Sequence, residues 1–362
     1  MKLKLEAILS LTTPMHIADG SSAYYDPATN RISYGIATCP LTRTFRLPIV
    51  TPDNPEDENE VARERDVPII PGNTVRGIMR RKCASSVFDK IQSQNQMLSA
   101  NAQAFLTFDA YHSATCGNRS GKPEAASFSD NIRKMRHPFV GLVGGTAAMI
   151  PSSMTTGIGI PICETTVKAS MIPSWLTPLA ASGRLTHISP FSRKDDLQRI
   201  ADTEAPWAVI KDFEQQAIAY YSAMSDNAKA RKKGKSKDAD AEDGEKAKKL
   251  DLVSWNAIEM IRPGTKLHSH FSVDTALIGS LGLGLFFDGL LRFANHQRIG
   301  GWGRCCFGRY KTEIYIVDGD ERTPILSGEG ENHRYNDIPL ISDAVAEWNT
   351  HKLDVNELEN LL

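Results

Sequence analysis

The sequence lacks any large excess of charge of one sign. Its 362 residues include 42 Lys and Arg and 43 Asp and Glu, which gives a formal net charge of −1. A protein that binds a polyanion over its whole surface is usually strongly basic. Any site for such a ligand must therefore be a local basic patch.

Cysteine is scarce, and long apolar runs are few. The six cysteines form no C-x-x-C pair, so we expect no zinc site. No signal-like segment precedes them, which favours reduced thiols in a cytoplasmic protein. The most apolar stretch, residues 275–294, carries Asp288, Arg292 and four glycines. It therefore predicts a buried helix and no membrane partner.

Familiar catalytic signatures are missing as well. The glycine-rich segment 300–304 has no G-K-[ST] and precedes a strand, so neither a P-loop nor a Rossmann loop is expected. His16 follows the first strand and could be a general base, although an ordinary loop histidine is the simpler interpretation. His268 and His270 share a strand face without an evident third ligand, so we predict no metal and no cofactor.

Hydrophobic periodicity predicts the main elements of an α+β fold. Residues 3–11 alternate between apolar and polar, as in a half-buried or edge strand. Apolar residues from Val75 to Ile91 recur every three or four positions and predict a helix capped by Asn73 or Thr74. Further elements are strands at 266–273 and 310–317, a last helix with Ala344, Val345 and Trp348, and a solvated charged loop at 226–250. This order favours a core whose halves are separated in the sequence.

Three local clusters could bind phosphates. The first helix carries Arg76, Arg80, Arg81 and Lys82 on its polar face, with no acid before Asp89. Its N-terminus adds amides and a favourable dipole. The glycine-rich segment would offer backbone amides beside two arginines, and a third basic cluster precedes residues 138–145. A solvated helix face and a tight turn are the alternatives.

Five segments together resemble a known family. Residues 68–80, PIIPGNTVRGIMR, resemble the P-x-I-P-G-S-S-L-K-G-x-x-R run of backbone subunits in the CRISPR-associated RAMP superfamily. Residues 13–17 (TPMHI) resemble its T-P-L-H-I-G strand exit, and residues 139–145 (FVGLVGG) are similar to its L-F-G segment. Residues 261–265 (IRPGT) are like its I-P-G-S, and residues 300–304 (GGWGR) lie where its glycine-rich loop belongs.

These matches follow one another in the family's order. The extra length and residues 193–196 (RKDD) look most like the backbone subunit of type IV systems. The resemblance implies a ferredoxin-like, RRM-type palm made from residues 1–100 and 255–330. It also implies inserted thumb and helical finger regions within 101–254 and a tail helix within 331–362.

The resemblance also implies a function. The subunit would be non-catalytic, would bind crRNA through its phosphate backbone, and would present the spacer to a complementary target nucleic acid. Its partners would be other CRISPR effector subunits and copies of itself in a head-to-tail filament. The expected RNA-binding residues are His16, Gly72, Asn73, Thr74, Arg76, Arg80, Arg81, Arg133, Lys134, Arg136, Arg193, Lys194, Arg298, Gly300, Gly301, Gly303 and Arg304.

One departure from the family bears on catalysis. RNA-cleaving type III backbone subunits carry an aspartate in a run like G-A-x-D-S-P-V. Residues 35–41, GIATCPL, align with it and place Thr38 at the aspartate position. We therefore predict that the chain does not cut its target. The alternatives are a metal-independent endoribonuclease with His16 as base, and a type III-like cleaving subunit. An apolar wedge in the thumb would be Met171 or Ile172.

Overall fold

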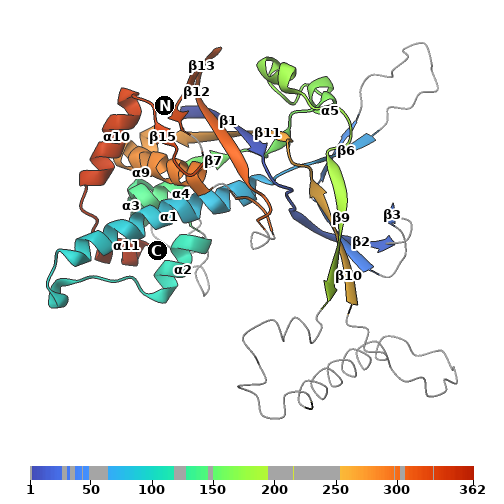
Figure 1. Ribbon diagram of the computed structural model, residues 1–362. Coiled ribbons are helices and arrows are strands. Elements are labelled where there is room, and N and C mark those ends of the chain that lie inside the picture. Colours follow the sequence, from blue (N-terminus) through green and yellow to red (C-terminus); the bar gives the residue numbers. More distant parts are fainter. Residues whose placement is uncertain are drawn as a thin grey trace. The chain divides into compact units, whose positions relative to one another are not determined.

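The chain divides into two compact units (Figure 1). Unit 1 consists of Met1–Ser21, Pro40–His187 and Glu259–Leu362, and unit 2 consists of Ser22–Cys39 and Ile188–Ile258. The computed structural model describes residues 2–26, 31–32, 37–42, 44–48, 64–117, 128–145, 150–194, 215, 253–296, 298–301, 306–328 and 330–362. The charged segment 226–250, predicted as a solvated loop, lies outside the described residues.

Unit 1 contains an antiparallel sheet that joins strands from both ends of the chain. Its order is β13 (Glu321–Pro324), β12 (Tyr310–Asp318), β1 (Lys2–Leu11), β11 (Lys266–Asp274) and β7 (Met154–Thr156). A short strand, β8 (Ile160–Pro161), also pairs with β11. The predicted strands at 3–11, 266–273 and 310–317 are confirmed. The edge position considered for the first strand is wrong, because β1 pairs with β11 and β12.

One face of this sheet is covered by helices (Figure 1). They are α1 (Gly72–Gln96), α4 (Pro138–Val143), α9 (Thr275–His296) and α10 (Pro339–Thr350). The alternate residues Leu3, Leu5, Ala7, Leu9 and Leu11 of β1 face them in a single large core. The helical side is completed by η1 (Ala100–Ala102), α2 (Phe108–Cys116), α3 (Phe128–Arg136) and α11 (Val355–Leu361). The mixed architecture confirms the expected α+β class.

The helix α9 is the apolar segment that the sequence singled out. By length and composition it could cross a membrane, but 56% of its most apolar window is buried inside the protein. Phe286, Phe287 and Phe293 are fully buried in the core of unit 1. The prediction of a buried helix is confirmed. In α10, the predicted core residues Ala344 and Trp348 are buried too.

The start of α1 differs from the prediction. The N-cap residue is Pro71, and no side-chain hydrogen bond caps the helix. The amides of Thr74 and Val75 both donate to the carbonyl of Pro71, at 2.9 and 3.4 Å. The helix therefore begins at Gly72, earlier than a cap by Asn73 or Thr74 would allow. A proline suits the start of a helix because the first amides have no partner within the helix.

The second face of the sheet is partly covered by the segment 160–181. It contains β8, α5 (Glu164–Lys168) and η2 (Ser174–Leu179). Ile172 is 7% exposed and packs with Ile8 and Leu176, while Met171 packs against Val67 and Cys163. Both residues proposed as an apolar wedge therefore serve local packing.

Smaller elements complete the description. Unit 1 holds the hairpins β5 (Thr44–Pro48) with β6 (Glu64–Pro68) and β14 (Leu326–Ser327) with β15 (Arg334–Tyr335). Unit 2 holds β3 (Arg31–Ile32), half of β4 (Ala37–Thr42), and most of β2 (Ala18–Asp26), β9 (Thr186–Lys194) and β10 (Val253–Ile261). Thr38 lies on β4, and its side chain is outside what the structure describes.

Candidate nucleic-acid interface

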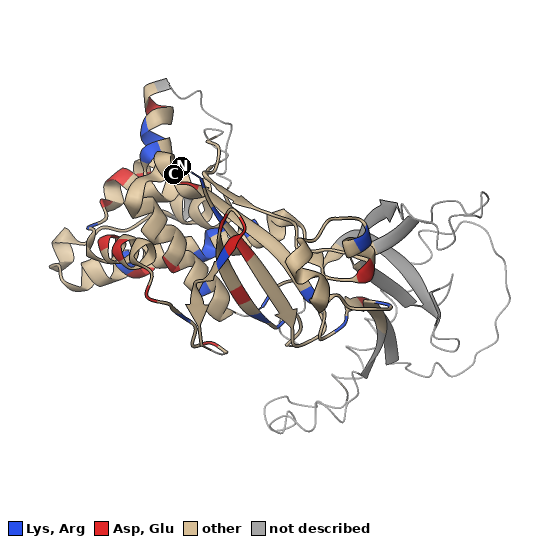
Figure 2. Ribbon diagram, turned by 90° about the horizontal axis from the view of Figure 1, so that it is seen from above, with Lys and Arg blue, Asp and Glu red and all other residues tan. Residues whose placement is uncertain are grey.

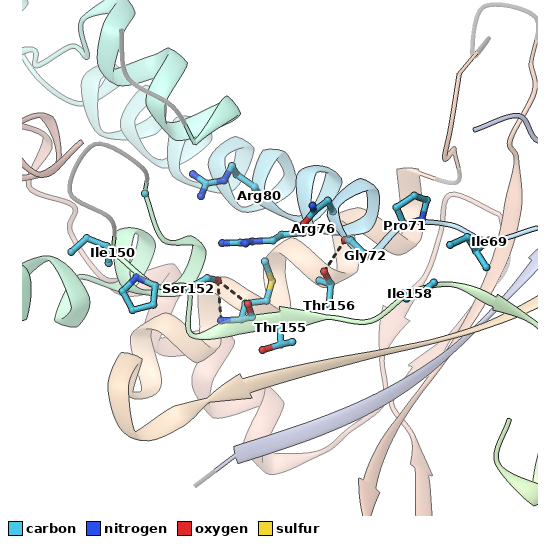
Figure 3. A pocket seen from close by; sticks show the side chains of 14 residues that line it. Ile69, Pro71, Gly72, Arg76, Arg80, Ile150, Ser152, Thr155, Thr156 and Ile158 are labelled. Carbon is cyan, nitrogen blue, oxygen red and sulfur yellow. Dashed lines mark hydrogen bonds between the residues drawn. The ribbon is translucent and has the colours of Figure 1, made fainter. Parts of the chain in front are cut away.

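Charge of both signs is interspersed over the elements of unit 1 (Figure 2). A polyanion site must therefore be sought in a local concave surface. One such surface is a groove of about 1030 Å³ between the first turns of α1 and the segment around β7 (Figure 3). It is lined by Ile69, Pro71, Gly72, Asn73, Arg76, Arg80, Gly145, Ile150, Pro151, Ser152, Met154, Thr155, Thr156 and Ile158. Four predicted RNA-binding residues, Gly72, Asn73, Arg76 and Arg80, thus meet in one groove.

The residue type at position 72 is set by the close approach of α1 to β7. A Cβ atom on Gly72 would lie 2.9 Å from the carbonyl oxygen of Thr156, which is too close. The hydroxyl of Thr156 donates to the carbonyl of Gly72 at 2.9 Å. A glycine here lets the helix start against the strand, so its exposed second residue, Asn73, borders the groove. The first amides of an uncapped helix can donate to an anion.

Arg80 overturns part of the sequence prediction. We expected four basic residues on an exposed face of α1, but Arg80 is 7% exposed. Its guanidinium donates to the carbonyls of Val143 and Gly144 at 2.6 and 2.7 Å. A longer bond of 3.4 Å joins it to the carbonyl of Ser113. Arg80 therefore ties α1 to the end of α4 and to α2 through three hydrogen bonds to backbone carbonyls.

Burial changes the electrostatics of Arg80. Desolvation, and then the nearby charge of Arg76, lowers the pKa of Arg80 to about 10. The side chain remains charged at neutral pH. It extends into the groove wall beside Arg76 (Figure 3), and it contributes positive potential from behind the surface.

Arg76 is the basic residue of the groove that stays accessible. It is partly exposed and makes one hydrogen bond, 3.3 Å long, from its Nη2 to the carbonyl of Val143. A guanidinium has five N–H donors, so most of those on Arg76 can face a ligand in the groove. The carbonyl of Val143, shared with Arg80, fixes its direction.

The helix α4 supplies those carbonyls and depends on His137. The Nδ1 atom of His137 accepts from the amides of Phe139 and Val140, at 3.2 and 3.3 Å, and so caps α4. Burial lowers the pKa of His137 to about 4. The ring is therefore neutral at pH 7, and its Nδ1 is free to accept.

The strand exit and the glycine-rich segment, far apart in the sequence, meet in space. The amide of Gly301 donates to the carbonyl of His16 at 2.9 Å, and the amide of Gly308 donates to that of Pro14 at 2.8 Å. Gly300 has φ +93°, and a Cβ there would lie 2.5 Å from the His16 carbonyl oxygen. The expectation of bare amides is wrong for Gly301, because its amide is already paired.

His16 itself is not an exposed loop histidine. Its side chain is 3% exposed, and its Nδ1 lies 2.8 Å from the carbonyl oxygen of Glu259. A carbonyl only accepts, so Nδ1 carries the proton. The hydroxyl of Thr42 donates to the same oxygen at 2.6 Å. This ring holds two segments of unit 1 together and is shielded from solvent, while its contact with RNA stays a prediction.

None of the remaining predicted residues that the structure describes in unit 1 lines the groove. Thr74 is partly buried, Arg81, Arg136 and Arg298 are exposed, and Lys134 is intermediate. Arg133 forms an exposed ion pair with Glu357 at 3.2 Å, which contributes little to stability. Arg193 and Lys194 end β9 in unit 2. Gly303 and Arg304 lie outside the described residues.

Sequence reasoning missed the second wall of the groove. It comes from residues 150–158, where Ser152 donates to the carbonyls of Leu142 and Met154 and Ile158 is exposed. This segment carries no motif, and its place depends on β7 pairing with β11. Within the described part of the chain, no group of three His, Cys, Asp or Glu could hold a metal ion.

Comparison with known proteins finds a resemblance among solved structures. No family model and no curated protein matches the chain. Among solved structures, the chain is similar to a chain of a "Type IV-B CRISPR Complex", with 13% sequence identity and a TM-score of 0.42. The match covers 91% of this chain and 96% of that chain. Because this TM-score is low, the function is inferred from the chain's own residues.

Proposed function

We propose that the chain is a non-catalytic backbone subunit of a CRISPR effector complex, most like that of type IV systems. It binds crRNA through the phosphate backbone, assembles head to tail along the spacer, and presents the bases for pairing with a target strand. Other effector subunits would complete the complex. The ordered set of motifs, from residues 13–17 to 300–304, is the sequence basis for this proposal.

The observation that carries the proposal is the groove at the start of α1. The run PGNTVRGIMR forms one wall of it, so the residues that resemble the family's longest motif meet at one surface. Its polar groups are a helix N-terminus, Asn73 and the accessible guanidinium of Arg76. These groups suit phosphates better than base edges, as a guide that must pair with a target requires.

The topology of unit 1 supports the proposed palm. The chain passes from β1 through α1 to β7, and from β11 through α9 to β12. The four strands lie in the order β12-β1-β11-β7, with both helices on one face. This order is the one expected for the βαββαβ arrangement of a ferredoxin-like palm, and it supports that part of the proposal. The thumb and finger regions would then be insertions into it.

The environment of His16 supports a non-catalytic role. A general base must reach the proton that it removes. His16 is 3% exposed, and its Nδ1 donates to a backbone carbonyl; this burial disfavours His16 as the base of the guide-processing alternative. Thr38 has no carboxylate, which disfavours the type III-like alternative.

The test is purification in high salt, followed by the ratio of absorbance at 260 and 280 nm and by electron microscopy. The proposal predicts a high ratio, RNA of discrete lengths and helical rods. Protein free of RNA that also forms monodisperse monomers would contradict it. Incubation with repeat RNA and with complementary RNA, with and without magnesium, should give no cleavage. Cuts in repeat RNA that vanish in His16→Ala would favour the processing enzyme.

A further inference from the structure

A second cavity in unit 1 collects positive charge on another side of α1. It has a volume of about 480 Å³ and lies between α1, the C-terminal end of α9, Arg298 and Glu331. The basic side chains of its lining are Lys82, Arg292, His296 and Arg298. Successive side chains of an α-helix point about 100° apart around the helix axis. Lys82 comes six residues after Arg76, so its side chain lies about 240° around the axis from that of Arg76. The cavity is therefore separate from the groove.

One of these cations is already neutralised. Arg292 donates to Asp288 at 2.7 Å and to Asp89 at 2.5 Å. Lys82 and Arg298 differ, because within the described chain neither side chain forms an ion pair or hydrogen bond. Glu331 is the one acidic residue of the lining. Within the described lining, Lys82 and Arg298 are thus two cations that face one carboxylate, Glu331.

The charges that act on two of these residues are mostly positive. Burial, followed by Arg292 and Arg81, lowers the pKa of Lys82. Burial also lowers the pKa of His296; the charges of Lys82, Arg298 and Arg81 act in the same direction, and Glu331 acts against them. Cations held together in this way destabilise one another, and a bound anion would remove that cost.

The chemistry of the lining indicates the kind of anion. The ammonium of Lys82 and the guanidinium of Arg298 are both donors that suit phosphate oxygens. The amide of Asn295, which could read a base edge, is occupied: its Oδ1 accepts from the amide of His333 at 2.8 Å. Its Nδ2 donates to the carbonyl of the same residue at 3.4 Å. The volume is sufficient for a phosphate with its sugars, because pockets of this size hold drug-sized ligands.

We propose that Lys82, His296 and Arg298 form a second phosphate site for a nucleic-acid backbone, on the side of α1 away from Arg76. This inference rests on the proposed function and adds a contact to it. The phosphate belongs either to the guide or to the strand paired with it. The two sources share one chemistry and differ in when the contact forms.

The first test compares salt dependence. The double variant Lys82→Gln/Arg298→Gln is measured beside Arg76→Gln and the exposed control Lys352→Gln. Binding of labelled single-stranded RNA is measured at salt concentrations between about 50 and 200 mM, and log K is plotted against log salt. Each phosphate contact on a single strand contributes about 0.7 to the steepness of this plot, so losing a contact reduces the slope by that amount. If the guide is the source, the double variant loses about 1.4 of slope. If the paired strand is the source, guide binding is unchanged, and the loaded double variant binds the complementary strand more weakly than wild type does.

The second test follows the imidazole of His296 by NMR. RNA in the cavity should raise the pKa of His296, and Arg76→Gln should leave that rise intact. If inorganic phosphate raises this pKa and RNA does not, the cavity is a site for free anions and the proposal is overturned. The proposal is also overturned if the double variant matches wild type both in binding the guide RNA and, once loaded, in binding the complementary strand.

The two failures can be told apart. If wild type binds RNA and Arg76→Gln reduces the slope, while the double variant matches wild type in binding both the guide and the complementary strand, the proposed function stands and this inference fails. If wild type binds no RNA at all, both fail.

Discussion

The basic side chains on two sides of α1 have different surroundings. On the groove side, Arg80 is buried and its guanidinium reaches three backbone carbonyls. On the other side, Lys82 and Arg298 share a cavity with His296 and have no such acceptors within the described chain. The first arrangement is self-sufficient, because each donor that leaves water gains a partner. The second is stable but incomplete without an anion.

This difference separates structural from binding residues within a single basic helix. A count of arginines and lysines treats Arg76, Arg80 and Lys82 alike. Their surroundings differ. Arg76 makes a hydrogen bond to a carbonyl and can still donate to a ligand, Arg80 links elements of the fold, and Lys82 has no partner within the described chain. Substitutions should therefore give opposite signs of stability change on the two sides.

The largest expected effect is on the groove side. Arg80→Ala would leave the carbonyls of Val143 and Gly144 without their donor, and hydrogen bonds to charged groups contribute roughly 1.5–3 kcal/mol. We expect the free energy of unfolding to fall by about 3 kcal/mol, measured by urea denaturation. The exposed Arg81→Ala is the control and should change it by less than about 0.5 kcal/mol. If Arg80→Ala and Arg81→Ala lowered the free energy of unfolding equally, Arg80 would have no special structural role.

Acid should weaken the same wall of the groove through His137. Its pKa is about 4 in the folded protein and about 6.5 when unfolded, so the unfolded chain binds more protons between these values. Stability is fully present above pH 6.5 and is lost as pH falls toward 4, by at most about 1.4 kcal/mol per pH unit. In the variant His137→Asn the asparagine can still cap α4, but this contribution to the slope of the free energy of unfolding against pH should disappear. A variant with the wild-type slope would exclude His137 as the cause.

The segment that leads away from the cavity offers a third test. Gly300 follows Arg298 closely, has φ +93°, and approaches the His16 carbonyl. Gly300→Ala should lower the free energy of unfolding by about 2 kcal/mol through backbone strain and the contact at Cβ. Thermal unfolding measures this loss. Gly319→Ala is a matched control, because it has φ +56° and its Cβ would meet nothing within 4 Å. Similar losses in both would show that strain alone matters and the contact with His16 does not.

The smallest expected effect has the opposite sign. Lys82→Gln removes one cation from a cluster of like charges and should raise the free energy of unfolding by a few tenths of a kcal/mol, since solvent screens this half-exposed group. Low-salt urea denaturation should detect the gain, and added salt should reduce it. A clear loss of stability would mean that Lys82 has a structural partner.

The sequence predicted the elements well, because their patterns are local. The alternation in residues 3–11 and the spacing from Val75 to Ile91 follow directly from strand and helix geometry. The cap of α1 was mispredicted, because Pro71 can start a helix without a side-chain acceptor. The central place of β1 could not be read from its own pattern, since it depends on pairing with two strands more than 250 residues away.

The candidate site was predicted in part. The motif around Gly72 and Arg76 does line a groove, but its second wall at 150–158 carries no motif. The burial of Arg80 and His16 could not be foreseen, because the carbonyls that hold them come from distant segments. The cavity at Lys82 needed α9 to be placed against α1, which no local pattern specifies.

The most direct test of the central claim is RNA binding by the wild-type protein to two unrelated spacer sequences over a series of salt concentrations. Recognition of the phosphate backbone predicts equal affinities and one shared negative slope of log K against log salt, with each contact contributing about 0.7. Arg76→Gln should reduce that slope for both sequences alike. Binding that depends on the sequence, or that is insensitive to salt, would contradict the account.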